Sequence, residues 1–374
     1  MNGWRMRVPS KKSAATSGTT GCPWRRATKA DAGAVEAFLR SRESRAAGLI
    51  ARLLSEGRLR IPSPLGPSGL WIREEGHGFD VGHGAEARAG EEGRVGVEAR
   101  AGAEGRVGVE ARAGAIQAAV LGLSGGLWFV QLPEGGRNAA GLALALEEAS
   151  RKPGFGAPPK PLSVIGPASS VAAFEGALGL SAAHRVDYIL MERGAWGSPS
   201  AAPLSEAKVP LSLWKASPAD LDELLPLQEA YEKEEVITPL RGFDAESCRS
   251  FLARNLAAEL IVGARLAPGA GASRVDRGGD GPRGALPAGR AIGKAATNAR
   301  AFTLDQIGGV FVEPGFRGRG VARAMMAFLL GSTAKEGRGA SLFVKKGNTP
   351  ALVLYERLGF APIDDFRASY HLPR

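Results

Sequence analysis

The sequence is poor in residues that cross-link a chain through disulfides or metals. Its 374 residues include two cysteines, Cys22 and Cys248, and four histidines. Two cysteines are too few for the disulfide framework of a secreted protein. A reducing, cytoplasmic location is therefore predicted. The histidines are too scattered to have the spacing of metal ligands, and no metal site is predicted. They are His77, His83, His184 and His371.

Long apolar runs are also missing. A membrane-spanning helix needs roughly 20 consecutive apolar residues. The longest candidate, residues 115–130, is broken by Gln117 and by Ser124-Gly125-Gly126. Serine and threonine follow the basic N-terminus, where a signal peptide needs an apolar core. The sequence therefore predicts neither a membrane segment nor an export signal.

Glycine, proline and positive charge are abundant instead. The chain contains 52 glycines and 24 prolines, and its formal net charge is +10. Such a charge attracts anionic partners, including nucleic acids. However, much of it lies in Gly/Ala/Arg-rich stretches and in the N-terminal tail, which is typical of solvated basic segments. The distribution of charge does not favour a nucleic-acid partner.

The length predicts two domains, because one domain usually contains about 100–200 residues. Residues 1–27 lack periodicity and are expected to be a disordered basic leader or an over-extended start of translation. Residues 28–193 are predicted to form an N-terminal α/β domain, and residues 207–374 a second domain. The Gly/Pro/Ser-rich residues 194–206 are the predicted linker.

Two low-complexity insertions are expected within these domains. Residues 82–115 contain Glu86-Ala87-Arg88-Ala89-Gly90, a repeat that returns from Glu98 and from Glu110. The repeat has too few large apolar side chains to bury a face, so a mobile loop is expected rather than a solenoid. The Gly/Pro/Arg-rich residues 267–289 are expected to be a similar insertion in a hairpin.

Periodicity predicts the regular elements of both domains. In the first domain, a helix capped by Ser169 or Ser170 is expected to end at Leu178, and in the second, Ser217 is expected to cap a helix. The other helices are expected at 35–54 (two), 142–150 and 245–256, and the strands at 70–72, 118–123, 127–132, 162–165, 186–191, 211–215, 258–264 and 290–297. The first domain carries no group of residues to which we can assign chemistry.

A glycine-rich segment of the second domain predicts an anion site. The apolar strand 307–312 ends at Glu313-Pro314, since proline cannot donate to a strand ladder. Gly318 and Gly320 follow, and an apolar stripe then predicts a helix ending near Gly337. Backbone N–H groups and the positive end of the helix dipole would point to one place. Taken alone, this pattern also fits an ordinary basic turn.

A second segment follows at residues 341–360. A strand at 341–344 precedes a helix with Asn348 or Thr349 as its cap and Gly359 just past its end. Tyr355 shares one face of this helix with apolar residues, so it could be a simple core aromatic.

Together these two segments resemble the GNAT acetyltransferase superfamily. Residues 312–322 resemble its pyrophosphate motif, Arg/Gln-x-x-Gly-x-Gly/Ala, matched at Arg317, Gly320 and Ala322. Residues 348–360 resemble the segment Asn-x-x-Ala-x-x-x-Tyr-x-x-x-Gly-Phe. The resemblance covers about residues 205–374 and is similar to a bacterial two-domain subgroup with a degenerate N-terminal half. It implies an α/β (α+β) fold in which helices flank a mixed, mostly antiparallel sheet, preceded by a second, smaller α/β domain.

The resemblance also implies acetyl-CoA as acyl donor and assigns residues to it. Strand 310–312 would pair with the pantetheine arm, the loop 317–322 would hold the diphosphate, and Asn348 would touch the arm. Tyr355 would lie near the sulfur and protonate the leaving thiolate. The donor-binding residues are thus Val310, Phe311, Val312, Arg317, Gly318, Arg319, Gly320, Val321, Ala322, Asn348 and Tyr355.

An amine acceptor must lose a proton before it attacks, so a base is needed. Glu313 is the first candidate and Glu235 the second, although each fits a surface carboxylate equally well. The predicted function is transfer of an acetyl group to a primary amine of a small molecule or peptide. An inactive acyl-CoA-binding protein and a basic nucleic-acid-binding protein are the alternatives. The sequence predicts neither the acceptor nor the oligomeric state.

Overall fold

The computed structural model describes most of both predicted domains. The described residues are 24–63, 65–66, 68–74, 115–133, 139, 141–151, 156–194, 207–240, 242–258, 260–267 and 289–372. Most of the predicted leader, linker and two insertions lie outside them, so the domain boundaries stay predictions.

The N-terminal half alternates helices and strands as its periodicity predicts. Its elements are β1 (Trp24–Arg26), η1 (Lys29–Asp31), α1 (Ala32–Arg40), α2 (Glu43–Leu53), β2 (Leu54–Ser55), β3 (Arg58–Leu59), β4 (Gly69–Glu74), β5 (Ile116–Gly122), β6 (Leu127–Gln131), α3 (Leu142–Arg151), β7 (Ser163–Pro167), α4 (Ala168–Leu178) and β8 (His184–Arg193). The cap prediction for α4 is wrong: Pro167 is the N-cap, and the Ser170 hydroxyl bonds the backbone of Leu132 instead.

The C-terminal half follows the same plan. Its elements are β9 (Leu211–Lys215), η3 (Pro218–Asp220), α5 (Leu221–Tyr231), η4 (Glu232–Val236), α6 (Ala245–Ala258), β10 (Ile261–Leu266), β11 (Ala291–Arg300), β12 (Leu304–Val312), η5 (Pro314–Phe316), α7 (Val321–Lys335), β13 (Gly339–Lys345), α8 (Thr349–Arg357) and β14 (Ala361–Tyr370). Ser217 forms the predicted cap, with Asp220 as its capping-box partner.

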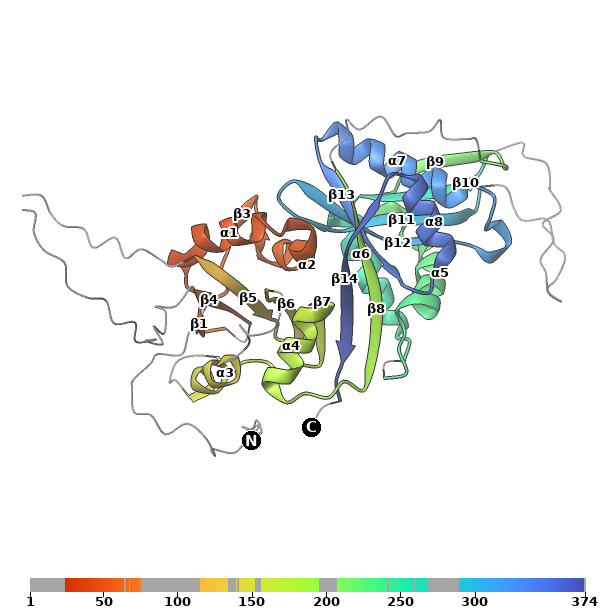
Figure 1. Cartoon of the computed structure of the whole chain (residues 1–374). Helices are drawn as coiled ribbons and strands as arrows, with labels where there is room; N and C mark the ends of the chain where they lie inside the picture. The colour runs from red at the N-terminus through yellow and green to blue at the C-terminus, as the bar shows by residue number, and fades with distance from the viewer. Residues whose placement is uncertain are drawn as a thin grey trace, which may run out of the picture.

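A single 12-stranded sheet joins the two halves (Figure 1). The strand order is β1-β4-β5-β6-β7-β14-β8-β13-β12-β11-β10-β9. Most neighbours are antiparallel, but β6 pairs with β7, and β12 with β13, in parallel. A mixed, mostly antiparallel sheet with flanking helices confirms the predicted fold class.

The halves exchange their last strands. β8, from the N-terminal half, lies between β13 and β14, whereas β14, at the end of the chain, lies between β7 and β8. Figure 1 shows β8 and β14 running side by side between the halves. The sequence does not predict β14, because Pro362, Asp364 and Asp365 are residue types that strands generally disfavour.

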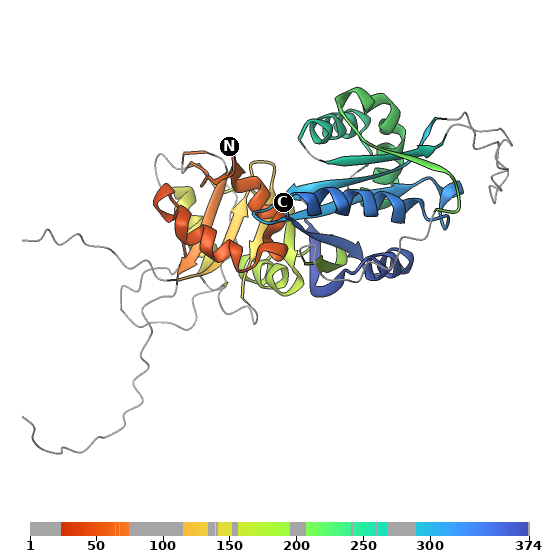
Figure 2. The same cartoon turned by 90° about the horizontal axis from the view of Figure 1, so that it is seen from above.

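Helices cover both faces of the sheet. In the C-terminal half, α7 packs on the face that carries Val262, and α5 and α6 pack on the face that carries the neighbouring Ile261 (Figure 2). Alternate residues of one strand thus feed two cores, as the period of two requires. The N-terminal half repeats this: α1 and α2 share a core with Ile72, while α3 and α4 share one with Trp71.

Candidate functional site

The site lies where β12 and β13 separate. The two strands pair only from Leu304 to Ile307 on β12 and from Gly339 to Leu342 on β13. Beyond this point β12 has an irregular register with β11, and Gly309 adopts a φ of 59°. A cavity of about 1290 Å³ opens here, lined by the ends of both strands. The irregularity therefore bends β12 away from its parallel neighbour.

A buried lysine supports this bend. Lys294 of β11 is 2% exposed, and its Nζ donates a hydrogen bond of 3.0 Å to the Gly309 carbonyl. The same Nζ lies 4.8 Å from the centroid of the Tyr231 ring. Burial lowers the pKa of Lys294 to about 8, because the charged form loses its hydration, while Cys248 and Glu232 partly oppose the shift.

The loop after β12 leads directly into the N-terminus of α7. Gly318 and Gly320 have φ values of 72° and 85°, in the left-handed region that favours glycine. A Cβ on Gly320 would also lie 3.3 Å from the Ala207 Cα. All residues from Arg317 to Ala322 line the cavity. The first N–H groups of a helix lack intrahelical partners, so this loop offers an anion site.

The Arg317 side chain joins this loop to its neighbours. Its Nε donates to the Val312 carbonyl at 2.9 Å, and its Nη2 donates to a Glu234 carboxylate oxygen at 2.7 Å. The guanidinium therefore connects the loop with η4. Positive charge at the loop also comes from Lys208, Arg319 and Arg323, which line the same cavity.

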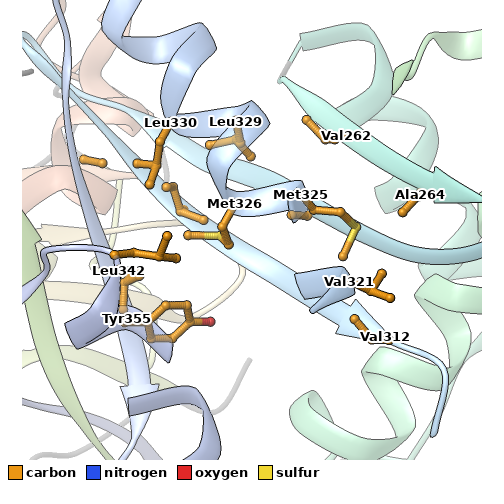
Figure 3. Close-up of a cluster of buried hydrophobic side chains, with 14 of the residues drawn as sticks. Val262, Ala264, Val312, Val321, Met325, Met326, Leu329, Leu330, Leu342 and Tyr355 are labelled. Carbon is orange, nitrogen blue, oxygen red and sulfur yellow. The ribbon is translucent and has the colours of Figure 1, made fainter. Parts of the chain in front are cut away.

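Tyr355 enters the cavity from α8. Asn348 caps this helix, as predicted, by accepting a hydrogen bond of 3.2 Å from the Ala351 N–H. Tyr355 is 8% exposed and packs edge-on against Phe360. Figure 3 shows it in the same core as Met326 and Leu342. Burial raises the pKa of the Tyr355 phenol, and the charges of Tyr231 and Glu235 raise it further. The phenol is therefore held in its protonated form.

The two candidate bases have different surroundings. Glu235 lies on η4, a π-helical turn closed by a 2.9 Å bond from the Ile237 N–H to the Glu232 carbonyl. Its carboxylate lines the cavity and pairs with Lys345 at 2.8 Å. Glu313 is not among the lining residues, and its carboxylate bonds Arg290. The geometry favours Glu235 over Glu313, the reverse of the order given by the sequence.

Comparison with known proteins agrees with this geometry. Residues 284–362 match the family described as the acetyltransferase (GNAT) domain. The chain contains a GNAT acetyltransferase domain. The match extends from just before β11 to the first residues of β14, and so includes the open strand pair, the α7 loop and Tyr355. No curated protein matches the sequence at a significant level.

Solved structures resemble the whole chain. A Drosophila protein is 12% identical, with 94% of this chain and 99% of that chain covered and a TM-score of 0.52. A GCN5-related N-acetyltransferase from Sphaerobacter thermophilus is 16% identical (94% and 96% covered, TM-score 0.49). A tandem GNAT protein from the clavulanic acid biosynthesis pathway is 14% identical (94% and 99% covered, TM-score 0.45). At 12% identity, the likeness to the Drosophila protein bears on the fold alone.

Several residues at the GNAT cavity were not predicted from the sequence. All four tyrosines of the chain line it, so Tyr188, Tyr231 and Tyr370 join the predicted Tyr355. Tyr231 fits the apolar stripe of α5, and Tyr188 and Tyr370 lie on β8 and β14, the exchanged strands. No local pattern marks these three residues, and Tyr188 of the N-terminal half reaches the cavity only through the strand exchange.

Among the described residues, no group of three or more His, Cys, Asp or Glu side chains is placed to hold a metal ion. In the same part of the chain, no helix combines the length and apolar character needed to cross a membrane.

Proposed function

We propose that this protein is an acetyl-CoA-dependent N-acetyltransferase that acetylates a primary amine of a small molecule or peptide. The observation that carries the proposal is the opening between β12 and β13, which meets the α7 N-terminus and Tyr355 in one cavity. An anion site, an unpaired strand edge and a buried acid are together what an acyl-CoA thioester requires.

The cavity suits the donor chemically. The pantetheine arm contains amide groups, which can bond to a strand edge as an added peptide strand does. Residues 310–312 of β12 have no strand pairing on the β13 side and line the cavity. The diphosphate would bind the amides of residues 317–322, with Arg319 and Arg323 supplying charge. Asn348 also lines the cavity, at the base of α8.

We assign the proton transfers to two side chains. Glu235, directly or through a water, would accept the proton that an ammonium must lose before its nitrogen can attack the thioester carbonyl. The C–N bond forms, the C–S bond breaks, and Tyr355 would donate its proton to the thiolate. The second proton that the nitrogen loses would then return to the Tyr355 phenolate, and the proton taken by Glu235 would pass to solvent. The products are the N-acetyl compound and coenzyme A. The raised pKa of Tyr355 keeps this proton available at neutral pH.

Acetyl-CoA binding measured by calorimetry tests the donor site, and thiol release with a panel of primary amines tests the reaction. We expect binding by the wild-type protein and none by a variant combining Arg317→Glu with Gly320→Glu. If the double variant binds as wild type does, the donor site is wrong. Binding without thiol release for any amine would instead support an acyl-CoA-binding protein without catalytic activity.

A further inference from the structure

The cavity continues well beyond Tyr355, along one face of the sheet. Residues directly opposite each other on antiparallel strands point to the same face. Lys345, Tyr188 and Phe366 form one such row across β13, β8 and β14. Val186, Ala368 and Ile165 form the next row, which reaches β7 in the N-terminal half. All six residues line the cavity, so an acceptor trough runs from the thioester end toward the N-terminal half.

Beyond Lys345, which pairs with Glu235 at 2.8 Å, the floor of this acceptor trough is aromatic and aliphatic. The Phe343 and Phe366 rings lie 4.2 Å apart, and Tyr188 lies 6.3 Å from Phe343. On the far side the trough is bounded by Leu49 and Gly48 of α2. A Cβ on Gly48 would lie 2.9 Å from the Phe129 ring, so α2 sits close against the end of the floor.

Charged groups at the edge of the trough already have partners. Arg45 pairs with Asp364, Arg185 with Glu175 and Asp187 with Arg367. At the thioester end Glu235 and Glu234 also line the cavity, where they pair with Lys345 and Arg317. A carboxylate has several acceptor sites, so each can still accept a hydrogen bond from an ammonium group. The trough therefore favours one positive end and an uncharged body.

The volume leaves room for such a body beside the donor arm. Pockets for a single small ligand are usually about 300–1,000 Å³, whereas this cavity measures about 1290 Å³. Resting on the proposed function, we propose that the acceptor is an elongated primary amine with one charge. Its nitrogen lies between Glu235 and Tyr355, and its alkyl or arylalkyl body lies over Phe343 and Phe366 toward Ile165. Polyamines and other acceptors with a second charge on the body are excluded by the apolar floor.

The test is a series of straight-chain primary amines of increasing length, with matched α,ω-diamines. We expect kcat/KM to rise about fourfold per added methylene until the trough is full, the factor that burying one methylene gives. Each diamine should react more slowly than the monoamine of the same length. A flat length profile, or diamines as good as monoamines, overturns the inference.

Substitutions then locate the body of the amine. Ala368→Trp fills the trough from β14 and should shift the optimum to shorter amines while leaving acetyl-CoA affinity unchanged. Ile165→Trp gives the same block from β7 if Ala368→Trp does not fold. Ala361→Trp, on the exposed end of β14 outside the cavity, is the matched control. An unchanged optimum in both blocked variants overturns the inference, whereas absence of acetyl-CoA binding by the wild-type protein overturns the proposed function itself.

Discussion

The two halves of the chain share one local plan and differ at one place. In each, a strand leads through a loop and a helix to a parallel neighbour: β6, α3 and β7 in the first, β12, α7 and β13 in the second. Gly141 precedes α3 with a φ of 82°, as Gly320 precedes α7 with a φ of 85°. Both glycine carbonyls accept the first helical hydrogen bond, at 3.0 Å.

The difference is whether the end of the first strand is open. In the N-terminal half, the Ser170 hydroxyl accepts from the Leu132 N–H at 3.0 Å and donates to the Leu132 carbonyl at 2.9 Å. β7 stays close, since a Cβ on Gly166 would lie 2.4 Å from the Val130 carbonyl oxygen. In the C-terminal half the corresponding space is the cavity. The two halves share one topology, but a cavity forms only at the end of β12, because among the described residues no side chain fills that space as Ser170 does at the end of β6.

The largest expected effect is a loss of acetyl-CoA affinity on substitution of Gly320, but not of Gly141. Gly320→Glu and Gly141→Glu should both destabilise the fold by about 1–2 kcal/mol, because each forces a left-handed residue. Only Gly320→Glu also places a carboxylate beside the proposed diphosphate site, so acetyl-CoA affinity should fall about 100-fold or more. Calorimetry and urea unfolding of the pair measure the two effects. If both variants lost the same affinity for acetyl-CoA, the donor site would not be confined to the C-terminal half.

Removal of the proposed acid should have the next largest effect. Tyr355→Phe should lower kcat about 100-fold, near the lower end of what acid catalysis provides, with little change in acetyl-CoA affinity. Because burial raises the pKa of Tyr355 above its usual value near 10, the wild-type kcat should not fall as pH rises toward 10. Phe328→Leu, on the exposed side of α7, is the control. If Tyr355→Phe has the same kcat as the wild-type protein, Tyr355 is not the acid.

The buried lysine of the C-terminal half, Lys294, should make the stability of the protein depend on pH. The pKa of Lys294 is lowered to about 8 in the folded protein, from 10.5 in an exposed lysine. Between these values the unfolded chain binds the extra proton, so this lysine makes the free energy of unfolding rise with pH, by up to about 1.4 kcal/mol per pH unit. Urea unfolding from pH 7 to 10.5 should show this rise in wild type and a smaller one in Lys294→Met. Identical slopes would show that Lys294 does not titrate in this range.

The smallest expected effect is a loss of stability from a substitution in the N-terminal half, where Ser170 occupies the strand end. Ser170→Ala leaves the buried Leu132 backbone groups without their partner, which should cost about 1–3 kcal/mol of stability. Ser332→Ala removes a comparable hydroxyl bond, to Phe328, on an exposed helix face and should cost less than about 0.5 kcal/mol. Chemical denaturation compares the two. Acetyl-CoA affinity should be unchanged in both, and a loss of affinity in Ser170→Ala would place part of the donor site in the N-terminal half.

Local patterns predicted much of the donor end of the cavity. The Asn348 cap, the glycine-rich turn before α7 and the apolar strand before it all depend on residues a few positions apart, and the structure shows each of them. Caps and turns follow from backbone hydrogen bonding and steric limits that act within one or two turns of chain. The same reasoning failed for Ser170, where a partner distant in sequence, Leu132, took the hydroxyl.

The sequence by itself thus determined the order of most elements and the glycine-rich turn before α7, because both arise from short-range geometry. The tertiary structure alone decided which carboxylate faces the cavity, that β8 and β14 exchange places, and that aromatic side chains from both halves form one floor. These features depend on strand pairing between residues more than a hundred positions apart, such as Tyr188 and Phe366. No periodicity or spacing along the chain encodes which of the possible pairings forms.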